Sequence, residues 1–240
     1  MKRLAVKVDG FAVLRESRRA REPDPVAAAV LAELAGTDRI AIHLRGDRRG
    51  TQERDAELMR RMIGVELHLH MAATNDMIKT ALALKPDSVS LVPERHDEQG
   101  TSGGLDVLLN AAHLKKAHNS LREAGLRVAL LIDPDLDQVK GVYKLGAQMV
   151  HFFTGKLGEA VDGAQRAHEQ RRLAEAARTA SRIGLKVLAG GSLGYRDMAW
   201  VARMEEIEEI HVGHAFVSRA CLVGVERAVR ELRDAIAGRW

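Results

Sequence analysis

The stretch Ile40-Ala41-Ile42-His43-Leu44-Arg45-Gly46-Asp47-Arg48-Arg49 begins as an alternating apolar run and ends in a burst of charge. An apolar run of this kind predicts a β-strand that is buried on at least one face. Because side chains alternate between the faces of a strand, His43 and Arg45 share one face and the isoleucines occupy the other. A polar pair that closes a buried strand indicates a functional site at the end of that strand.

The same strand pattern recurs along the chain, and segments of helical period lie between the runs. The eight apolar runs are Leu4–Val8, Arg39–His43, Val65–His70, Ser88–Val92, Arg127–Ile132, Met149–Phe153, Leu185–Ala189 and Glu209–Val212. The helical segments include Pro25–Leu34, Arg54–Met62, Asn75–Leu84, Gly104–Glu123, Leu136–Lys144 and Gly158–Arg182. Eight strand–helix units predict an α/β fold, a (β/α)8 TIM barrel with extra helices. No linker interrupts residues 1–240, so we expect one TIM-barrel domain.

Composition limits the classes of partner. The chain has 240 residues, of which 46% are hydrophobic, and its 37 basic residues are offset by 33 acidic ones. This balance and an aromatic content of only 3% predict no nucleic-acid binding. The single cysteine, Cys221, excludes an internal disulfide and suits a reducing cytoplasm. Because neither a signal peptide nor a membrane span is visible, we expect a cytoplasmic protein without a membrane partner.

Strand parity predicts an unusually polar barrel interior. The interior-facing positions are Lys7, Asp9, Ala41, His43, Arg45, His68, His70, Ser88, Ser90, Glu94, Asp133, His151, Phe153, Lys186, His211 and Gly213. TIM barrels normally fill this space with branched apolar residues, and buried charges are costly unless they are paired. The pattern therefore favours a ligand site over a purely structural hydrogen-bond network.

Glycine-rich turns follow the last two predicted strands. They are Gly190-Gly191-Ser192 and Gly213-His214, and a helix begins close to the second. Glycines allow backbone N–H groups to approach a phosphate, and the amino end of a helix attracts an anion. Because TIM barrels often bind phosphate at this place, we expect a small phosphorylated substrate there.

Several motifs together resemble the pyridoxine 5′-phosphate synthase family of vitamin B6 biosynthesis. They include Val8-Asp9, His43-Leu44-Arg45 with Asp47-Arg48-Arg49, Leu91-Val92-Pro93-Glu94, Gly103-Gly104-Leu105-Asp106, Thr154-Gly155, Ala189-Gly190 and Gly213-His214-Ala215. The resemblance covers essentially the whole chain. It implies a barrel enzyme that assembles as a homodimer or homo-octamer and acts in B6 biosynthesis.

In that family the reaction condenses 1-deoxy-D-xylulose 5-phosphate with an amino-oxopropyl phosphate and releases phosphate and water. The resemblance implies that His43 is a general base and that Asp9 touches the sugar-derived substrate. It also implies that Arg18 and Arg45 hold phosphate or hydroxyl groups, while Gly213 and His214 cradle the phosphate that is retained.

The chain departs from the family pattern at several functional positions. The family's first strand carries Asn-x-Asp-His, where this chain has Lys7-Val8-Asp9-Gly10. Its catalytic glutamate on the third strand is His70, its catalytic histidine after the seventh strand is Gly191, and a glutamate on its sixth strand is His151. A histidine and a substrate-binding threonine of the family are replaced by Gly50 and Gly100. Two of three acid–base positions have therefore changed type. Because each such group contributes on the order of 10²–10⁴-fold to rate, we expect a diverged enzyme of this family. The unchanged synthase and a non-catalytic binder of a phosphorylated ligand are the alternatives.

Two of the replacing residues, His70 and Lys7, have side chains that can take part in acid–base or Schiff-base catalysis. We expect His43 and His70 to form the acid–base pair, with Lys7 and Asp9 at the substrate carbonyl and Glu94 among the binding residues. Lys7 could form a Schiff base if a second cation, Lys186, lay nearby, or it could simply pair with Asp9.

Histidines at strand spacing also raise the question of a metal. No cofactor is expected from the family, but His68, His70 and His151 are candidate ligands for a divalent metal. Glu94 or Asp9 could complete such a site. Ordinary hydrogen bonding of these histidines inside the barrel is the alternative.

Overall fold

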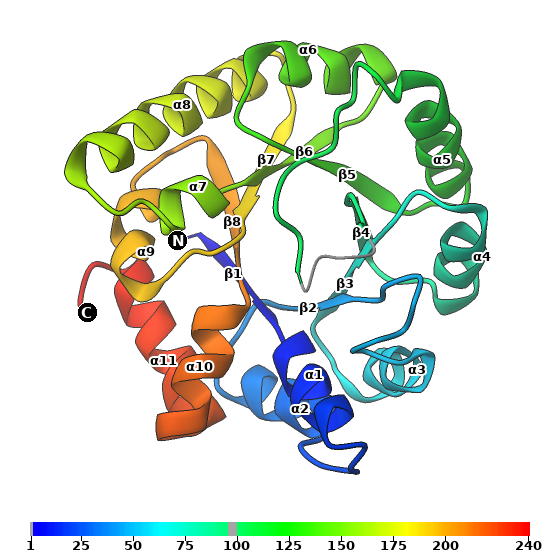
Figure 1. The fold of residues 1–240 in the computed structure, drawn as a ribbon, viewed down its shortest axis with the longest axis vertical. Helices are drawn as coiled ribbons and strands as arrows, with labels where there is room; N and C mark the ends of the chain where they lie inside the picture. The colour runs from blue at the N-terminus through cyan, green and yellow to red at the C-terminus, as the bar shows by residue number, and fades with distance from the viewer. Residues whose placement is uncertain (1, 96–99) are drawn as a thin grey trace.

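A computed structural model describes residues 2–95 and 100–240, and it confirms the predicted (β/α)8 TIM barrel (Figure 1). Eight parallel strands close in sequence order, and β8 pairs with β1. The strands are β1 (Arg3–Lys7), β2 (Arg39–His43), β3 (Glu66–Met71), β4 (Ser88–Leu91), β5 (Arg127–Ile132), β6 (Met149–Phe153), β7 (Lys186–Gly190) and β8 (Ile207–Val212). Each strand begins and ends within two residues of its predicted range.

Helices surround the barrel on its outer side (Figure 1). They are α1 (Asp9–Ser17), α2 (Pro25–Leu34), α3 (Glu53–Met62), α4 (Asn75–Leu84), α5 (Ala111–Glu123), α6 (Leu136–Leu145), α7 (Gly155–Gly158), α8 (Gly163–Arg182), α9 (Tyr195–Ala202), α10 (His214–Val223) and α11 (Val225–Ile236). Within the described ranges, none of these helices is both long and apolar enough to cross a membrane.

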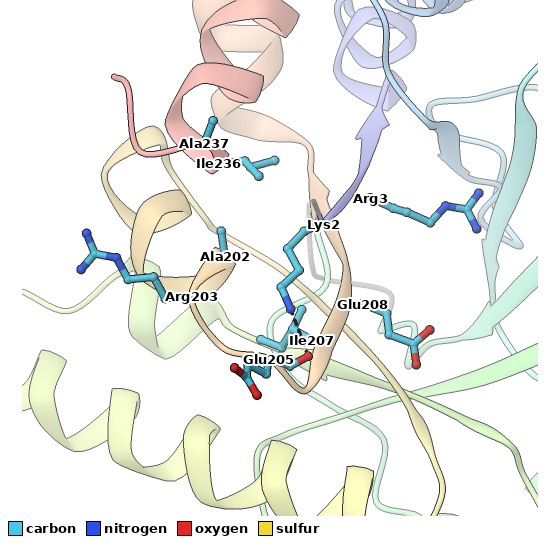
Figure 2. Close-up of a pocket in the computed structure, with 9 residues that line it drawn as sticks. All are labelled: Lys2, Arg3, Ala202, Arg203, Glu205, Ile207, Glu208, Ile236 and Ala237. Carbon is cyan, nitrogen blue, oxygen red and sulfur yellow. Dashed lines mark hydrogen bonds between the residues drawn. The ribbon is translucent and has the colours of Figure 1, made fainter.

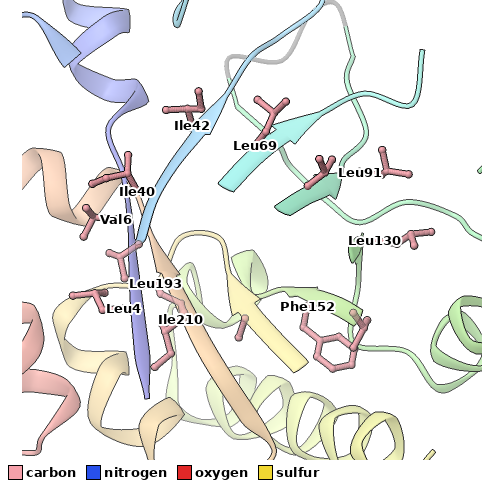
Figure 3. Packing of buried hydrophobic residues seen from close by; sticks show 14 of the residues in the cluster. Leu4, Val6, Ile40, Ile42, Leu69, Leu91, Leu130, Phe152, Leu193 and Ile210 are labelled. Carbon is pink, nitrogen blue, oxygen red and sulfur yellow. The ribbon is translucent and has the colours of Figure 1, made fainter. Parts of the chain in front are cut away.

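Alternation along the strands sorts side chains between the helix layer and the barrel interior. Val6 on β1 and Ile40 on β2 are register partners, and both are completely buried with Ile42 in the main apolar cluster (Figure 3). Burying one such side chain stabilises the fold by about 1.5–3 kcal/mol. Because these residues face the helices, the alternate positions, including Lys7 and His43, face the interior.

Two predicted helices have different boundaries in the structure. The segment from Gly104 is not helical until Ala111, because Gly104 packs against the end of β5, where an added Cβ would lie 2.1 Å from the backbone nitrogen of Asp133. The predicted helix Gly158–Arg182 begins only at Gly163, as α8, because the preceding helix α7 ends at Gly158. The side chain of Asp162 caps the start of α8 by accepting a hydrogen bond from the Gln165 backbone N–H at 2.7 Å.

A buried charge network closes the barrel at the amino ends of the strands. The guanidinium of Arg39, only 1% exposed, donates to Glu209 Oε1 at 2.8 Å and also to Glu66. Glu66 receives further hydrogen bonds from Arg3 and Arg127, both at 2.6 Å. Although burial acts in the opposite direction, these arginines lower the pKa of Glu66 to about 2. The network holds Glu209 as a carboxylate beneath the interior histidines.

Replacing Arg39 should destabilise the fold strongly. Arg39→Leu leaves the buried carboxylate of Glu209 without its main cation, so we expect a loss of about 3–5 kcal/mol in the free energy of unfolding. Urea denaturation measures this loss. The matched control, Arg127→Gln, removes an exposed partner of Glu66 and should cost less than about 1 kcal/mol. Equal losses in the two variants would contradict this assignment.

Candidate active site

His43 and Glu94 form a hydrogen-bonded pair at the carboxyl ends of the strands. His43 is the last residue of β2, and Glu94 follows β4. His43 Nε2 lies 3.0 Å from Glu94 Oε1, while Glu94 Oε2 accepts the Gly46 backbone N–H at 3.0 Å. Both side chains are mostly buried, at 10% and 13% exposure. TIM-barrel active sites form at this end of the barrel.

The environment sets the charge of each partner. Burial lowers the pKa of His43, with the charge of Lys7 acting in the same direction, so the imidazole is neutral near pH 7. Although burial opposes it, hydrogen bonds from His43 and Gly46 lower the pKa of Glu94, which is therefore a carboxylate. A carboxylate only accepts hydrogen bonds, so Nε2 of His43 carries the proton and Nδ1 is the basic nitrogen.

Asp9 connects the ends of the first two strands. Its Oδ1 accepts the backbone N–H of His43 at 2.5 Å and the hydroxyl of Thr51 at 3.1 Å. Its Oδ2 lies 3.5 Å from Lys7 Nζ, so the two predicted catalytic residues form an ion pair. This favours the pairing alternative for Lys7 over the Schiff base. Lys186 lies exposed at the opposite end of the barrel, at the start of β7, so its prediction as an interior cation beside Lys7 is wrong.

The two arginines predicted to hold phosphate lie in different places. Arg45 is buried after β2 and donates to Asp47 at 3.3 Å and to the Arg95 carbonyl oxygen at 3.0 Å. Arg18 is exposed and caps the far end of α1, the helix that begins at Asp9. The structure therefore brings Arg45, but not Arg18, to the His43–Glu94 pair.

The two glycine-rich turns lie at neighbouring strand ends, as predicted. Gly190 ends β7, and Gly191 and Ser192 continue with φ angles of +110° and +51°. The hydroxyl of Ser192 donates to Glu159 at 2.8 Å. Gly213 precedes α10, and His214 is its first residue. Its N-cap residue, Gly213, has no side chain to cap the helix, so among the described residues the backbone N–H groups of the first turn can receive an anion.

A cluster of four buried histidines lies deeper in the barrel. His68 and His70 from β3, His151 from β6 and His211 from β8 each offer a nitrogen within 4.8 Å of the others. His70 Nε2 lies 3.3 Å from His211 Nδ1. Burial is the main cause that lowers the pKa of all four rings, which are therefore neutral.

The structure changes the predicted pairing of these histidines. His43 and His70 have ring centres 6.4 Å apart, and the hydrogen-bond partner of His43 is Glu94, which was predicted as a binding residue and not as the acid–base partner. His211 joins the cluster in place of the predicted Glu94 or Asp9. Strand parity placed His211 in the interior, and that was the available signal for its inclusion.

One surface hollow lies away from these residues. It has a volume of about 640 Å³ and is lined by residues such as Lys2, Arg203 and Glu208 at the amino ends of β1 and β8 (Figure 2). Lys2 Nζ donates to the Glu205 carbonyl oxygen at 3.0 Å. Because this end of a TIM barrel generally serves stability rather than catalysis, we do not assign the active site to it.

Comparisons with known proteins agree with the fold and identify close sequence relatives. A family model described as pyridoxal phosphate biosynthesis protein PdxJ matches residues 4–238. Pyridoxine 5′-phosphate synthase of Synechococcus sp. (strain JA-2-3B'a(2-13)) is 48% identical over 97% of this chain and 98% of its own. The enzyme of the same name from Syntrophotalea carbinolica is 46% identical over 98% of each chain.

Solved structures with low sequence identity share the fold alone. KGPDC from Streptococcus mutans aligns over 100% of both chains with a TM-score of 0.67 and 12% identity. Thiamine phosphate pyrophosphorylase from Pyrococcus furiosus covers 99% of this chain and 96% of its own, with a TM-score of 0.62 and 17% identity.

Because four histidines are buried in the neutral form, we expect the free energy of unfolding to decrease as the pH falls. Their pKa values are lowered in the folded protein, whereas in the unfolded chain they titrate near 6.5. As the pH falls below about 6.5, the unfolded chain therefore binds protons that the folded chain does not. We expect the free energy of unfolding to fall by up to about 1.4 kcal/mol per pH unit for each such histidine. Urea denaturation between about pH 7.5 and about pH 5 measures the slope.

One variant isolates the contribution of a single ring. His151→Gln should reduce the slope by about one proton, because the replaced ring no longer titrates in the unfolded chain. His168→Gln is the control, since the His168 side chain is 62% exposed on α8. A slope that His151→Gln leaves unchanged would contradict the prediction.

Proposed function

The chain belongs to the family of the pyridoxal phosphate biosynthesis protein PdxJ, and we propose that it catalyses an acid–base condensation of a small phosphorylated carbonyl or amine substrate. This family consists of barrel enzymes of vitamin B6 biosynthesis, and the chain is one of its members. We further propose that its reaction has diverged from the one that names its relatives. The observation that carries the acid–base assignment is the His43–Glu94 hydrogen bond.

His43 has the properties of a general base in this proposal. Its neutral imidazole can take a proton at Nδ1 from a carbon next to the substrate carbonyl, and the charge that develops on the ring lies 3.0 Å from the Glu94 carboxylate. Glu94 thus orients the ring and stabilises the imidazolium. Asp9 supports the same geometry because it accepts the His43 backbone N–H.

Phosphate binding completes the proposed substrate site. The uncapped first turn of α10 behind Gly213 offers backbone N–H groups at the carboxyl end of β8. Arg45 supplies a buried guanidinium after β2. A substrate held between these two places spans the mouth of the barrel, where His43 lies. This supports a phosphorylated substrate at the mouth of the barrel.

The surroundings of Gly191 support a diverged reaction. The resemblance implies a proton-transferring histidine at this position, but glycine transfers no proton. Gly191 has a φ of +110°, and an added Cβ would lie 2.7 Å from the ring of Phe153. The space that such a side chain needs is therefore partly filled. The glutamates implied on the third and sixth strands are His70 and His151, whose rings are buried and neutral.

Unchanged pyridoxine 5′-phosphate synthase is the second candidate function. The relatives of that name are 44–48% identical to this chain over 97–100% of its length, which favours it. Complementation of a pyridoxine-requiring bacterium separates the candidates. Growth would establish the synthase reaction and refute divergence. Absence of growth from folded, expressed protein would agree with a diverged enzyme or a non-catalytic binder.

Proton abstraction from a substrate distinguishes a diverged enzyme from a non-catalytic binder. We expect the purified protein to catalyse exchange of the protons next to the carbonyl of 1-deoxy-D-xylulose 5-phosphate in D₂O, measured by NMR. His43→Gln should slow this exchange by about 10²–10⁴-fold, because it removes the base. The wild-type rate should be flat above about pH 6.5 and fall in acid, since the pKa of His43 is lowered.

Two further variants control this experiment. Glu94→Gln keeps the shape of the partner but removes its charge, so it should also slow exchange. His118→Gln replaces a buried histidine on α5, outside the barrel, and should leave the rate unchanged. Binding of the ketone phosphate without any exchange would refute the enzyme and favour the non-catalytic binder.

A further inference from the structure

We propose that His70, His151 and His211 form a binding site for one divalent transition-metal ion inside the barrel. The site is independent of the proposed reaction, because none of its three ligands belongs to the His43–Glu94 pair. Three strands supply its ligands, since His70 lies on β3, His151 on β6 and His211 on β8.

The distances fit a metal that bridges two of the rings. His70 Nε2 and His211 Nδ1 are 3.3 Å apart. Two nitrogens that each lie about 2.1 Å from one tetrahedral zinc ion are separated by about 3.4 Å, so little movement is needed. The ring centres of His70 and His211 are 5.4 Å apart, and that of His151 lies 5.3 Å from the first and 4.5 Å from the second.

The third nitrogen has no other role among the described residues. His151 is 1% exposed, and its Nε2 is buried without a hydrogen-bond partner in the part of the chain that the structure describes. Leaving a buried polar nitrogen unpaired is unfavourable. A metal ion bound at this lone pair satisfies it, whereas a purely structural histidine network leaves it unexplained.

Hydrogen bonds outside the three rings orient two of them toward a common centre. Glu209 Oε1 accepts from His211 Nε2 at 2.7 Å, which leaves the lone pair on Nδ1. Arg39 holds this carboxylate at 2.8 Å. Carboxylate–histidine pairs of this kind fix the tautomer and raise the basicity of a metal ligand.

Ser90 performs the same function for His151. Its hydroxyl lies 3.0 Å from His151 Nδ1 and 2.8 Å from His68 Nε2, and His68 Nδ1 lies 2.8 Å from Ser88 Oγ. A metal at His151 Nε2 requires the direction His151 Nδ1–H to Ser90, Ser90 O–H to His68 Nε2, and His68 Nδ1–H to Ser88. Arg39 Nη1 lies 3.4 Å from His68 Nδ1, and in this direction it donates to Glu209 Oε1 at 2.8 Å instead. This direction uses both nitrogens of His68 and leaves Nε2 of His151 as a free ligand.

The chemistry of the donors selects the class of metal. Neutral imidazoles suit Zn²⁺, Ni²⁺, Co²⁺, Fe²⁺ or Cu²⁺ and are poor ligands for Mg²⁺ or Ca²⁺. Burial keeps the rings neutral. The nearby cations are already paired, since Lys7 lies against Asp9 and Arg39 against Glu209 and Glu66. Three histidine ligands leave a fourth coordination position for water or substrate.

Metal titration of the untagged protein tests the proposal. Protein purified without an affinity tag is stripped with a chelator and titrated with Co²⁺ and Zn²⁺ alone. We expect one ion per chain by elemental analysis after gel filtration, a visible Co²⁺ spectrum typical of tetrahedral coordination, and a higher Tm with Zn²⁺. Folded wild-type protein that binds no stoichiometric ion would overturn the proposal.

Variants test the named ligands. His151→Gln and His211→Gln should each abolish the Co²⁺ spectrum and the Zn²⁺-dependent rise in Tm. His168→Gln and His118→Gln replace an exposed and a buried histidine outside the cluster and should change neither. Ser90→Ala keeps all three ligands and should weaken binding by about 10–100-fold. If the ligand variants do not fold, Ser90→Ala decides, and wild-type affinity in it would refute the assignment.

Discussion

Removal of water from imidazole rings is the constraint on which the interior of this barrel depends. Four histidines occupy space that branched apolar side chains fill in most TIM barrels. They can remain there because burial keeps them neutral and because at least one nitrogen of each ring is engaged by a serine, by Glu209 or by another of the rings. Arg39 and Glu209 add charge only as a matched pair. The interior is thus polar without carrying an unbalanced charge.

This polar filling is confined to one part of the interior. The other part is apolar and holds small separate clusters, with Ala129, Met149 and Leu188 in one and Val92, Leu131 and Phe153 in the other. β5 supplies only apolar interior residues at these levels, whereas β6 supplies His151 between the apolar Met149 and Phe153. Polar side chains therefore come from β2, β3, β4 and β8 together with His151, and the site at the mouth shares that part through His43 and Lys7.

The sequence predicts the interior faces better than it predicts the contacts between them. Alternation of Ile40, Ala41, Ile42 and His43 determines which side chains point inward, and the structure agrees. Parity does not state how far along the barrel axis two residues lie, and this depends on the stagger between strands. Lys186 consequently lies at the opposite end from Lys7. His43 is the register partner of His70, but its imidazole bonds to Glu94, which follows β4 outside the strand. Helical periodicity likewise extended through Gly104, where close packing against β5 prevents a helix.

The changes around the mouth are connected to one another, and this explains how a barrel can keep its architecture while its chemistry alters. Gly191 and Phe153 share one space, because a side chain at Gly191 would meet the Phe153 ring. Restoring a histidine at position 191 alone would thus require the ring to move. His70 and His151 belong to a network whose hydrogen bonds depend on Ser90, His211 and Glu209. A carboxylate at either position would be buried beside neutral rings, and Lys7, whose charge acts on both positions, is already paired with Asp9. The interior must therefore change as a unit, and the His43–Glu94 pair, whose own hydrogen bonds run to Gly46 and Asp9, remains separate from that unit.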